Sequence, residues 1–203
     1  MAENQITYIV IEGNIGAGKT TLATRLAEHM GAALVLEEFA ENAFLPQFYT
    51  NPEKYGFPLE LSFMAARYHQ LRKTFEEKGS GVVVSDYHFH KSKLFASVNL
   101  DPAELELYQS FFHIVSAQIP EPQLLVYLDK DIQTLQKNIR KRGRPFETAI
   151  TDEYLNKITG EYQRFLETQK KSRVLKLDTN NSDFIANEND FKTIVNAILS
   201  HSY

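Results

Sequence analysis

The segment from Gly13 to Thr20, GNIGAGKT, constrains the fold of this chain more than any other. It matches the pattern G-x-x-x-x-G-K-[ST], in which backbone N–H groups of a glycine-rich turn surround phosphates. A β-branched run predicts a strand over residues 6–12 before it, and helical spacing predicts a helix over residues 19–30 after it. A chance match in an ordinary turn is the alternative, with odds on the order of 1% for a chain of this length. The sequence therefore predicts nucleotide binding.

Each residue type in this segment has a physical role in holding a triphosphate. The glycines let the backbone wrap the phosphates, and the helix N-terminus adds its partial positive charge. Lys19 is expected to bridge the β- and γ-phosphates, and the Thr20 hydroxyl is placed for Mg²⁺, the expected cofactor of ATP. The predicted ATP-binding segment contains Gly13, Asn14, Ile15, Gly16, Ala17, Gly18, Lys19, Thr20 and Thr21.

Short apolar strands alternate with helices along the whole chain. Strands are predicted over residues 6–12, 32–37, 81–85, 123–129 and 174–178, and helices over 19–30, 40–49, 58–78, 102–119, 132–141, 151–171 and 190–200. This alternation predicts an α/β fold of the P-loop kinase type, a five-stranded parallel sheet flanked by helices on both faces. Without a repeat or a Gly/Ser linker, residues 1–203 are expected to form a single domain.

Composition narrows the partners and the compartment. With 22 Lys and Arg against 26 Asp and Glu, the net charge of −4 argues against general nucleic-acid binding. We expect no membrane span, because no apolar run reaches ~18–20 residues, and no signal peptide. The absence of cysteine fits a reducing compartment, and we expect a cytoplasmic protein. The 14 Phe and 10 Tyr imply either a ring-rich core or a site that stacks on a flat ligand.

A phosphate loop alone does not separate a GTPase, a motor ATPase and a small-molecule kinase. The guanine-reading Asn-Lys-x-Asp tetrad and the apolar strand ending in Asp-Glu are both missing from the sequence, which leaves a small kinase. Such enzymes close a cationic lid over the transferring phosphoryl group and exclude water. The cluster Arg140, Lys141, Arg142 and Arg144 predicts an arginine-rich lid at about residues 140–150. The alternative is a solvated basic helix end.

Phosphorylating an alcohol also needs a carboxylate near the acceptor hydroxyl. Ligands of parallel α/β sheets bind beyond the carboxyl ends of the strands, so acidic residues at strand ends are the candidates. Glu37 ends the strand predicted over residues 32–37 and is the candidate general base, with its neighbour Glu38 as the rival. Asp86 follows the strand predicted over 81–85 and is expected to hold Mg²⁺ together with Thr20.

Taken together, these segments resemble the deoxynucleoside kinase family, which contains the deoxycytidine, deoxyguanosine and deoxyadenosine kinases. The resemblance rests on GNIGAGKTT, Glu37, FLPQFYTNPEKY (44–55), the helix over 57–68, KRGRPFE (141–147) and SDF (182–184), in this order. It is stronger to bacterial deoxyguanosine kinases than to adenosine-preferring members, because of Leu59-Glu60 and Asp86-Tyr87-His88. The resemblance implies ATP-dependent phosphorylation of a deoxynucleoside 5′-hydroxyl. It also implies a homodimer, which the apolar helix over 102–119 supports.

The resemblance assigns roles to the residues that match the family pattern. Glu37 would be the general base for the 5′-hydroxyl, with Lys19 and Arg142 as further catalytic residues. Tyr49 and Glu147 would hold the deoxyribose 3′-hydroxyl. On the donor side, lid arginines would hold the phosphates and a late loop would cover the adenine. These donor residues are Arg140, Arg142, Arg144, Asp183 and Phe184.

Glu60 and Arg67 fall where the family reads the nucleobase edge, and seven residues of helix place them on one face with Phe63 and Met64. An ionised carboxylate only accepts hydrogen bonds. Guanine presents two parallel donors, whereas adenine presents one donor and one acceptor, so Glu60 predicts deoxyguanosine over deoxyadenosine. The implied substrate-binding residues are Glu37, Tyr49, Phe57, Glu60, Phe63, Arg67, Asp86 and Glu147.

The chain departs from the family pattern after the third predicted strand. Most members have Asp/Glu-Arg-Ser there, whereas this chain has Tyr87 in the arginine position, which leaves that role to Lys91 or Lys93. Ser92 also stands where an acid often pairs with the residue matching Arg67. Three alternatives stay open: a kinase for deoxyadenosine, deoxycytidine or several deoxynucleosides, a nucleoside monophosphate kinase, and a non-catalytic nucleotide-binding module.

Overall fold

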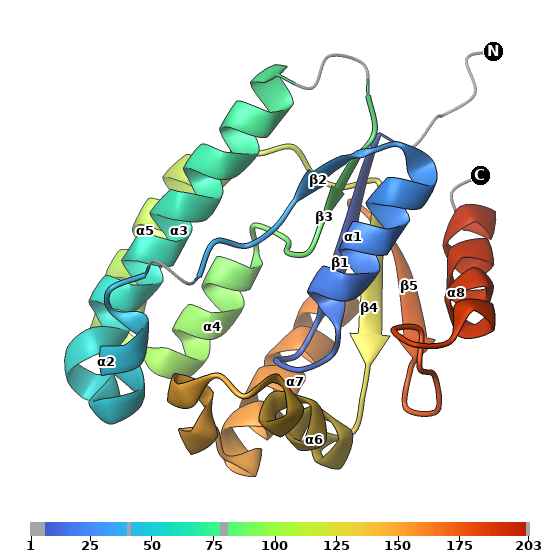
Figure 1. Cartoon of the computed structure of the whole chain (residues 1–203). Coiled ribbons are helices and arrows are strands. Elements are labelled where there is room, and N and C mark those ends of the chain that lie inside the picture. Colours follow the sequence, from blue (N-terminus) through green and yellow to red (C-terminus); the bar gives the residue numbers. More distant parts are fainter. Residues whose placement is uncertain (1–6, 40–41, 78–80, 202–203) are drawn as a thin grey trace.

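A parallel sheet forms the centre of the molecule (Figure 1). The computed structural model describes residues 7–39, 42–77 and 81–201, and these contain a five-stranded sheet in the order β2-β3-β1-β4-β5. Its strands are β1 (Tyr8–Gly13), β2 (Ala33–Val35), β3 (Val83–Ser85), β4 (Leu124–Asp129) and β5 (Arg173–Asp178). Every neighbouring pair is parallel. The predicted five-stranded parallel sheet is therefore confirmed.

The strand β1 lies in the middle of the sheet, with Tyr8 opposite Val83 of β3 and Ile9 opposite Leu124 of β4. All six of its residues are buried, because helices cover both faces. The chain leaves β1 toward β2 and β3 on one side and reaches β4 and β5 on the other. The strand order thus reverses beside β1, and ligands of open parallel sheets bind at such a point.

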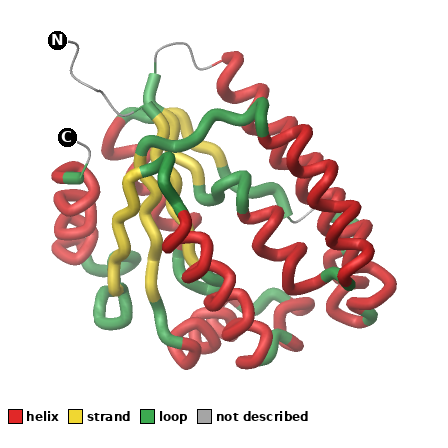
Figure 2. Tube along the Cα trace, turned by 180° about the vertical axis from the view of Figure 1, so that it is seen from behind, coloured by secondary structure: helices red, strands yellow, loops and turns green. Residues whose placement is uncertain are grey.

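Helices cover the two faces of the sheet in separate groups (Figures 1 and 2). One core cluster joins the sheet mainly to α1, α6 and α8, and the other joins it to α3, α4, α5 and α7. Ile9 and Ile11 of β1 belong to the first cluster, and Tyr8 and Val10 to the second, as side-chain alternation along a strand requires. The helices are α1 (Lys19–Met30), α2 (Leu45–Thr50), α3 (Pro52–Glu77), α4 (Lys91–Asn99), α5 (Pro102–Ser116), α6 (Ile132–Arg142), α7 (Asp152–Thr168) and α8 (Glu188–Ser200), with a 3-10 helix η1 (Pro145–Ala149).

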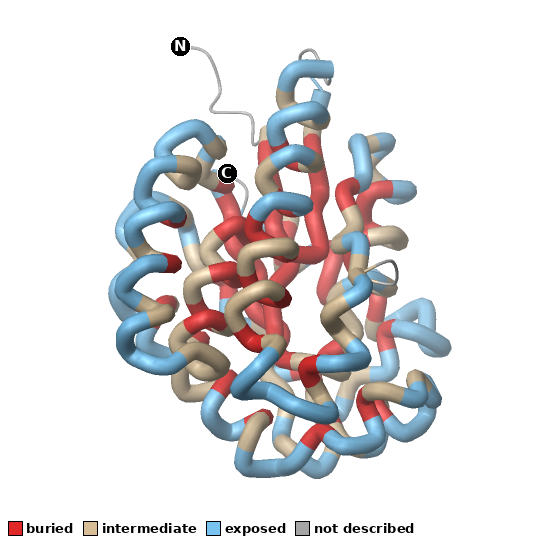
Figure 3. The backbone as a smooth tube through the Cα atoms, turned by 90° about the vertical axis from the view of Figure 1, so that its left-hand side faces the viewer, coloured by how far each residue is buried: buried red, intermediate tan, exposed pale blue. Residues whose placement is uncertain are grey.

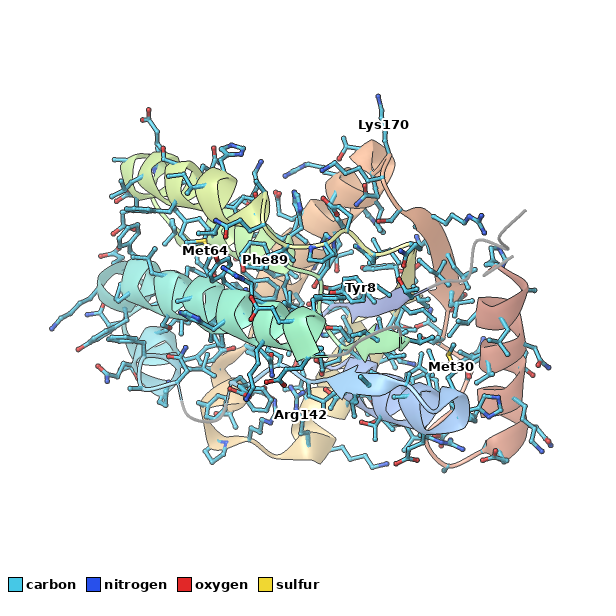
Figure 4. The ribbon with its side chains drawn as sticks, turned by 90° about the horizontal axis from the view of Figure 1, so that it is seen from above. Tyr8, Met30, Met64, Phe89, Arg142 and Lys170 are labelled. Atoms are coloured by element: carbon cyan, nitrogen blue, oxygen red, sulfur yellow. The ribbon has the colours of Figure 1, made fainter. Side chains whose placement is uncertain are left out.

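Burial is concentrated in the strands and in the inner helix faces, whereas the outer helix faces are exposed (Figure 3). Tyr8, Met64 and Phe89 lie in the interior on the α3 side of the sheet, and Lys170 projects outward after α7 (Figure 4). Buried rings are numerous in the second cluster, which accounts for part of the aromatic content. Among the helices of the described residues, none is both long enough and apolar enough to cross a membrane.

Three helices differ clearly from the sequence prediction. The helix predicted over residues 40–49 begins at Leu45 as α2, after turn residues at 43 and 44, because Pro46 is suited to the first turn of a helix. The helix predicted to start at Pro58 begins at Pro52, because Asn51 Oδ1 accepts a hydrogen bond from Lys54 N (3.2 Å) and Pro52 occupies the first helical position. Pro58 therefore lies inside α3. The helix α4 was not predicted, since it is only nine residues long and follows His90 instead of a Ser, Thr, Asp or Asn cap. The predicted boundaries at residues 6, 40 and 78 lie outside the described residues.

The packing of α8 against the sheet can be tested by a single substitution. Ile198 of α8 is fully buried, so Ile198→Ala is expected to lower the free energy of unfolding by about 2–5 kcal/mol. The matched control is Ile185→Ala, because Ile185 is 56% exposed, and its effect should stay within about 0.5 kcal/mol. Urea denaturation measures both. Equal losses in the two variants would contradict the packing of α8.

Candidate active site

A cleft opens at the carboxyl edge of the sheet, where ligands of open parallel sheets bind. Its walls come from segments far apart in the sequence: the phosphate loop, the segment after β2, the helices α2, α3, α4 and α7, and the lid at η1. The predicted site residues that line it are Ile15, Lys19, Thr20, Glu37, Tyr49, Glu60, Phe63, Arg67, Asp86, Arg142, Arg144 and Glu147.

The phosphate loop has the backbone conformation that its glycines permit. Gly16 and Gly18 have φ values of +86° and +96°, in the left-handed region. A Cβ on Gly16 would lie 2.8 Å from the Leu135 carbonyl oxygen, so the loop packs tightly on α6. Lys19 Nζ donates to the carbonyl oxygens of Gly13 (2.9 Å) and Asn14 (3.0 Å). Burial, with a smaller contribution from the charge of Lys91, lowers the pKa of Lys19 to about 8.

Asp86 joins the phosphate loop to the segment after β2. Its Oδ2 accepts a hydrogen bond from Thr20 Oγ1 (2.6 Å), and its Oδ1 accepts one from the backbone N–H of Glu37 (2.8 Å). Hydroxyl and carboxylate oxygens are the ligands that Mg²⁺ prefers, and Mg²⁺ usually adds substrate phosphates and waters to one or two protein carboxylates. Within the described residues, no group of three or more His, Cys, Asp or Glu could hold a metal by itself. The donor set of Thr20 and Asp86 therefore fits a Mg²⁺ ion that arrives with a nucleotide.

Glu37 lies between two cations at the centre of the cleft. Its Oε1 accepts from Arg67 Nε (2.8 Å) and Nη2 (2.6 Å), and its Oε2 accepts from Lys91 Nζ. Burial raises the pKa of Glu37, but the charges and hydrogen bonds of Lys91 and Arg67 outweigh burial and hold this pKa well below its usual range. Glu38 is exposed and accepts from Gln70 Nε2 (3.2 Å). Of the two candidate acids, the structure brings Glu37 into the cleft.

The residues after β3 place a lysine, and not Tyr87, in the cleft. Tyr87 is fully buried in the core, and its hydroxyl donates to Gln70 Oε1 (2.6 Å). Lys91, one turn later on α4, lines the cleft and pairs with Glu37, whereas Lys93 lies outside the lining. Ser92 Oγ accepts from Arg67 Nη1 (2.8 Å). Lys91 is therefore the cation that this region contributes to the cleft.

One face of α3 presents Glu60, Phe63 and Arg67 to the cleft, as the spacing predicts. Met64 packs in the core cluster beneath α3 instead of lining the cleft. Glu60 is 1% exposed, and its Oε1 accepts from Asn99 Nδ2 (2.7 Å). Burial raises the pKa of Glu60 to about 7.

Ion pairs hold the lid residues together, and ring contacts join the lid to the wall of the cleft. Arg142 donates to Glu147 Oε2 from Nε (3.0 Å) and Nη2 (2.5 Å), and Arg144 Nη1 donates to Glu147 Oε1 (3.2 Å). The guanidinium of Arg144 also lies 3.8 Å from the ring centroid of Phe39. The ring of Tyr49 stacks on Phe146 of η1 at 6.2 Å between centroids. These contacts place the arginines of the lid beside the predicted sugar-binding residues.

This arrangement agrees with comparisons to known proteins. A family model described as deoxynucleoside kinase matches residues 9–202. The chain belongs to the deoxynucleoside kinase family. A deoxyguanosine kinase of Bacillus subtilis (strain 168) is 38% identical over 198 residues, covering 94% of this chain and 95% of the relative. The deoxyadenosine/deoxycytidine kinase of the same strain is 30% identical over 201 residues, covering 96% and 92%.

The P-loop kinase fold is also that of solved relatives. The structure of a deoxyadenosine kinase from M. mycoides, with the products dCMP and a flexible dCDP bound, superimposes with a TM-score of 0.79 at 24% sequence identity. The match covers 95% of this chain and 99% of that chain. Kinases that are named for different bases thus resemble this chain at 38% and 30% identity.

Some residues predicted for the site lie elsewhere. Phe57 packs against the core cluster on the stripe 57, 61, 64 and 68 of α3, which turns away from the face that carries Glu60. The ring of Phe184 is 1% exposed and lies beneath Gly18, so it supports the phosphate loop from the core. Asp183 is exposed, and its Oδ1 accepts from Ala186 N (3.1 Å). Arg140 is exposed on the last turn of α6. A role of Asp183 or Phe184 beside the donor adenine stays a prediction.

The cleft also contains residues that sequence reasoning missed, namely Asn99, Tyr154 and Phe39. Asn99 is the last residue of α4, the helix that was not predicted, so its position could not be anticipated. Tyr154 is on α7, within a helix that was predicted, but only the packing of α7 against α4 brings it to the site. The sequence did contain one signal near Asn99. Asp101 and Pro102 mark the start of a helix, which implies a turn in the residues just before them.

The helix α7 fixes the phosphate loop through two buried polar contacts. Asn14 Nδ2 donates to the Leu155 carbonyl oxygen and to Thr159 Oγ1, both at 2.8 Å. Glu12, just before the loop, is 1% exposed, and its Oε2 accepts from the Tyr162 hydroxyl (2.7 Å). Its Oε1 accepts from the backbone N–H of His88 (2.7 Å). A buried carboxylate thus holds together the start of the phosphate loop, the segment after β3 and α7.

This contact predicts a loss of stability in Tyr162→Phe. The variant removes a hydrogen bond to a buried carboxylate, so the free energy of unfolding should fall by about 1–3 kcal/mol. Tyr68→Phe is the matched control, because the Tyr68 hydroxyl donates to Gln118 Oε1 (2.7 Å) at an exposed position. That change should cost less than about 0.5 kcal/mol. Chemical denaturation that found equal stability in both variants would show that the Glu12 carboxylate does not need Tyr162.

Proposed function

We propose that this member of the family transfers a phosphoryl group from ATP to the 5′-hydroxyl of a purine deoxynucleoside, with deoxyguanosine as the preferred acceptor. The observation that carries the base preference is the buried carboxylate of Glu60 in the cleft. In its ionised form it accepts two hydrogen bonds, which matches the N1–H and 2-amino donors of guanine. The relationship to a deoxyguanosine kinase at 38% identity supports the same acceptor.

The acceptor hydroxyl would lie beside Glu37. With its pKa held low by Lys91 and Arg67, this carboxylate is ionised at neutral pH and is ready to accept a hydrogen bond from the hydroxyl. Because the transition state of phosphoryl transfer is loose, orientation of the hydroxyl contributes more than basicity. Tyr49 and Glu147 line the cleft where the 3′-hydroxyl of the sugar would be held.

The donor would bind through the phosphate loop, with Lys19 moving from the loop carbonyls to the phosphates. Thr20 and Asp86 would hold Mg²⁺, which neutralises charge on the phosphates when it is bound. Arg142 and Arg144 would exchange Glu147 for the transferring phosphoryl group, since phosphate offers stronger bidentate partners than a single carboxylate. The lid then supplies positive charge where negative charge develops.

A substrate panel tests this function. The purified chain is incubated with ATP and Mg²⁺ and with each deoxynucleoside, ribonucleoside and nucleoside 5′-monophosphate. We expect the highest kcat/KM for deoxyguanosine, with dGMP as the product. Turnover confined to 5′-monophosphates would instead identify a nucleoside monophosphate kinase. ATP binding without any turnover would identify a non-catalytic nucleotide-binding module.

Single replacements of Glu37 and Glu38 test which of the two carboxylates acts on the acceptor hydroxyl. Glu37→Gln keeps the shape but loses the negative charge, so kcat should fall by about 10²–10⁴-fold. Glu38→Gln is the matched control and should keep kcat within about twofold, because Glu38 is exposed outside the cleft. Steady-state kinetics with deoxyguanosine measures both, and thermal unfolding verifies that each variant is folded. Near-normal kcat in Glu37→Gln would remove Glu37 from this role.

A homodimer and a cytoplasmic location belong to the same proposal. The helix α5 exposes Leu107 (50%), Phe111 (45%) and Ile114 (67%), which share one helix face at i, i+4 and i+7. A continuous apolar face of this kind fits a symmetric interface with a second copy of the chain. The cysteine-free sequence matches a reducing compartment.

Charge on the apolar face of α5 tests the dimer. Phe111→Asp would place a carboxylate at the centre of the interface, so the dimer should dissociate at micromolar concentration. Ile185→Asp changes an exposed isoleucine on another segment and should leave the assembly unchanged. Sedimentation velocity distinguishes the two sizes. A monomeric wild-type chain, or a Phe111→Asp dimer as tight as the wild type, would refute this interface.

A further inference from the structure

The two oxygens of the Glu60 carboxylate are not equivalent. Oε1 accepts a hydrogen bond from Asn99 Nδ2 at 2.7 Å. Oε2 is buried and makes no hydrogen bond with any described residue, although Glu60 lines the cleft. An unpaired buried carboxylate oxygen is costly in a folded protein, which is expected where a ligand supplies the missing partner. Asn99 therefore holds one oxygen of Glu60 as an acceptor, and the other oxygen has no partner among the described residues.

The surroundings of Glu60 leave its charge only weakly compensated. Burial raises its pKa to about 7, while Arg67 and the hydrogen bond from Asn99 act in the opposite direction. Arg67 is already paired with Glu37, whose own charge raises the pKa of Glu60 further. The titratable and charged groups that face Glu60 are Arg67 on α3, Glu37 after β2, Lys91 on α4, Tyr49 on α2, Tyr108 on α5 and Tyr154 on α7. The neutral and the ionised forms are thus both accessible near neutral pH.

Each form of the carboxyl group matches a different purine. The ionised form offers two acceptors, which pair with the N1–H and the 2-amino group of guanine. The neutral form offers a hydroxyl donor on Oε2 and an acceptor on Oε1, which pair with the N1 acceptor and the 6-amino donor of adenine. Because Asn99 donates to Oε1, the proton of the neutral form resides on Oε2, the oxygen without a partner in the protein.

We propose that Glu60 reads guanine when ionised and adenine when protonated, so that acidification moves the acceptor preference of one active site from deoxyguanosine toward deoxyadenosine, with Asn99 as the positioning residue. This inference rests on the proposed function. Two protonation states of one side chain in this chain would then serve the bases for which different relatives are named.

The direction and the size of the pH effect follow from the fractions of Glu60 that are ionised and protonated. Productive binding of deoxyguanosine requires the ionised form, whose fraction rises with pH, and productive binding of deoxyadenosine requires the protonated form, whose fraction falls. The ratio of kcat/KM for deoxyguanosine to that for deoxyadenosine should therefore rise about tenfold per pH unit, or about 100-fold from about pH 6 to pH 8. Titrations of Lys19 or Glu37 cancel in this ratio, because both acceptors use the same donor site and the same catalytic groups.

The experiment measures kcat/KM for both nucleosides at saturating ATP and Mg²⁺ and constant ionic strength across this pH range. Glu60→Gln fixes one donor and one acceptor at the reading position, so its ratio should favour deoxyadenosine and should not change with pH. Asn99→Ala removes the hydrogen bond that favours the ionised form, so the same ratio should be reached only at higher pH. A purely structural role of Asn99 would alter both acceptors equally and would leave the ratio in place.

The outcomes separate this inference from the function on which it rests. A wild-type ratio that is flat or falls with pH overturns the inference, while turnover of deoxyguanosine keeps the proposed function. A chain that phosphorylates deoxyguanosine but never deoxyadenosine also overturns the inference. If no deoxynucleoside is phosphorylated at any pH, the proposed function itself fails. The wild-type profile alone is decisive if Glu60→Gln does not fold.

Discussion

The ion pairs of Glu37 with Arg67 and Lys91 are the interaction on which the cleft depends. They join the segment after β2 to α3 and α4, and Glu37 is 30 and 54 residues from Arg67 and Lys91 in the chain. Arg67 and Lys91 are only 4% and 7% exposed, so each needs its carboxylate partner. Removing one partner of a buried pair costs about 3–5 kcal/mol, because the other charge stays behind without compensation. The same contacts that stabilise the fold therefore keep Glu37, the candidate general base, ionised.

At the lid, too, cationic side chains are paired with a carboxylate. Arg142 and Arg144 are both paired with Glu147, so one carboxylate compensates part of the positive charge of the two guanidinium groups in the free protein. Under the proposed function, binding of phosphates and binding of the sugar would be connected, since Glu147 would be shared between the arginines and the 3′-hydroxyl. Glu60 is the exception, because no cation of the described residues forms an ion pair with it, and its charge is compensated by the charge of Arg67 and by the hydrogen bond from Asn99.

Much of the fold could be predicted because it depends on local signals. The helix over residues 19–30 agrees with the prediction at both ends, since the glycines of the phosphate loop and Gly31 mark them. The sheet was predictable because buried parallel strands are continuous apolar runs. The start of α3 and the whole of α4 were not, because Pro58 resembles a helix start and α4 lacks a recognisable cap. Phe57 was misplaced because helical spacing defines a face but not which face meets the cleft.

The phosphate loop, the α/β class, the family pattern and the candidate acids could all be recognised in the sequence, because each is a local arrangement of residue types. The packing of the chain was needed to show which of two neighbouring acids faces the cleft, that Lys91 and not Lys93 lines it, and that Asn99 binds Glu60. These contacts depend on packing because charge and hydrogen-bond compensation act through space. Partners such as Asn99 and Glu60, 39 residues apart in the chain, become neighbours only when α3 and α4 pack together.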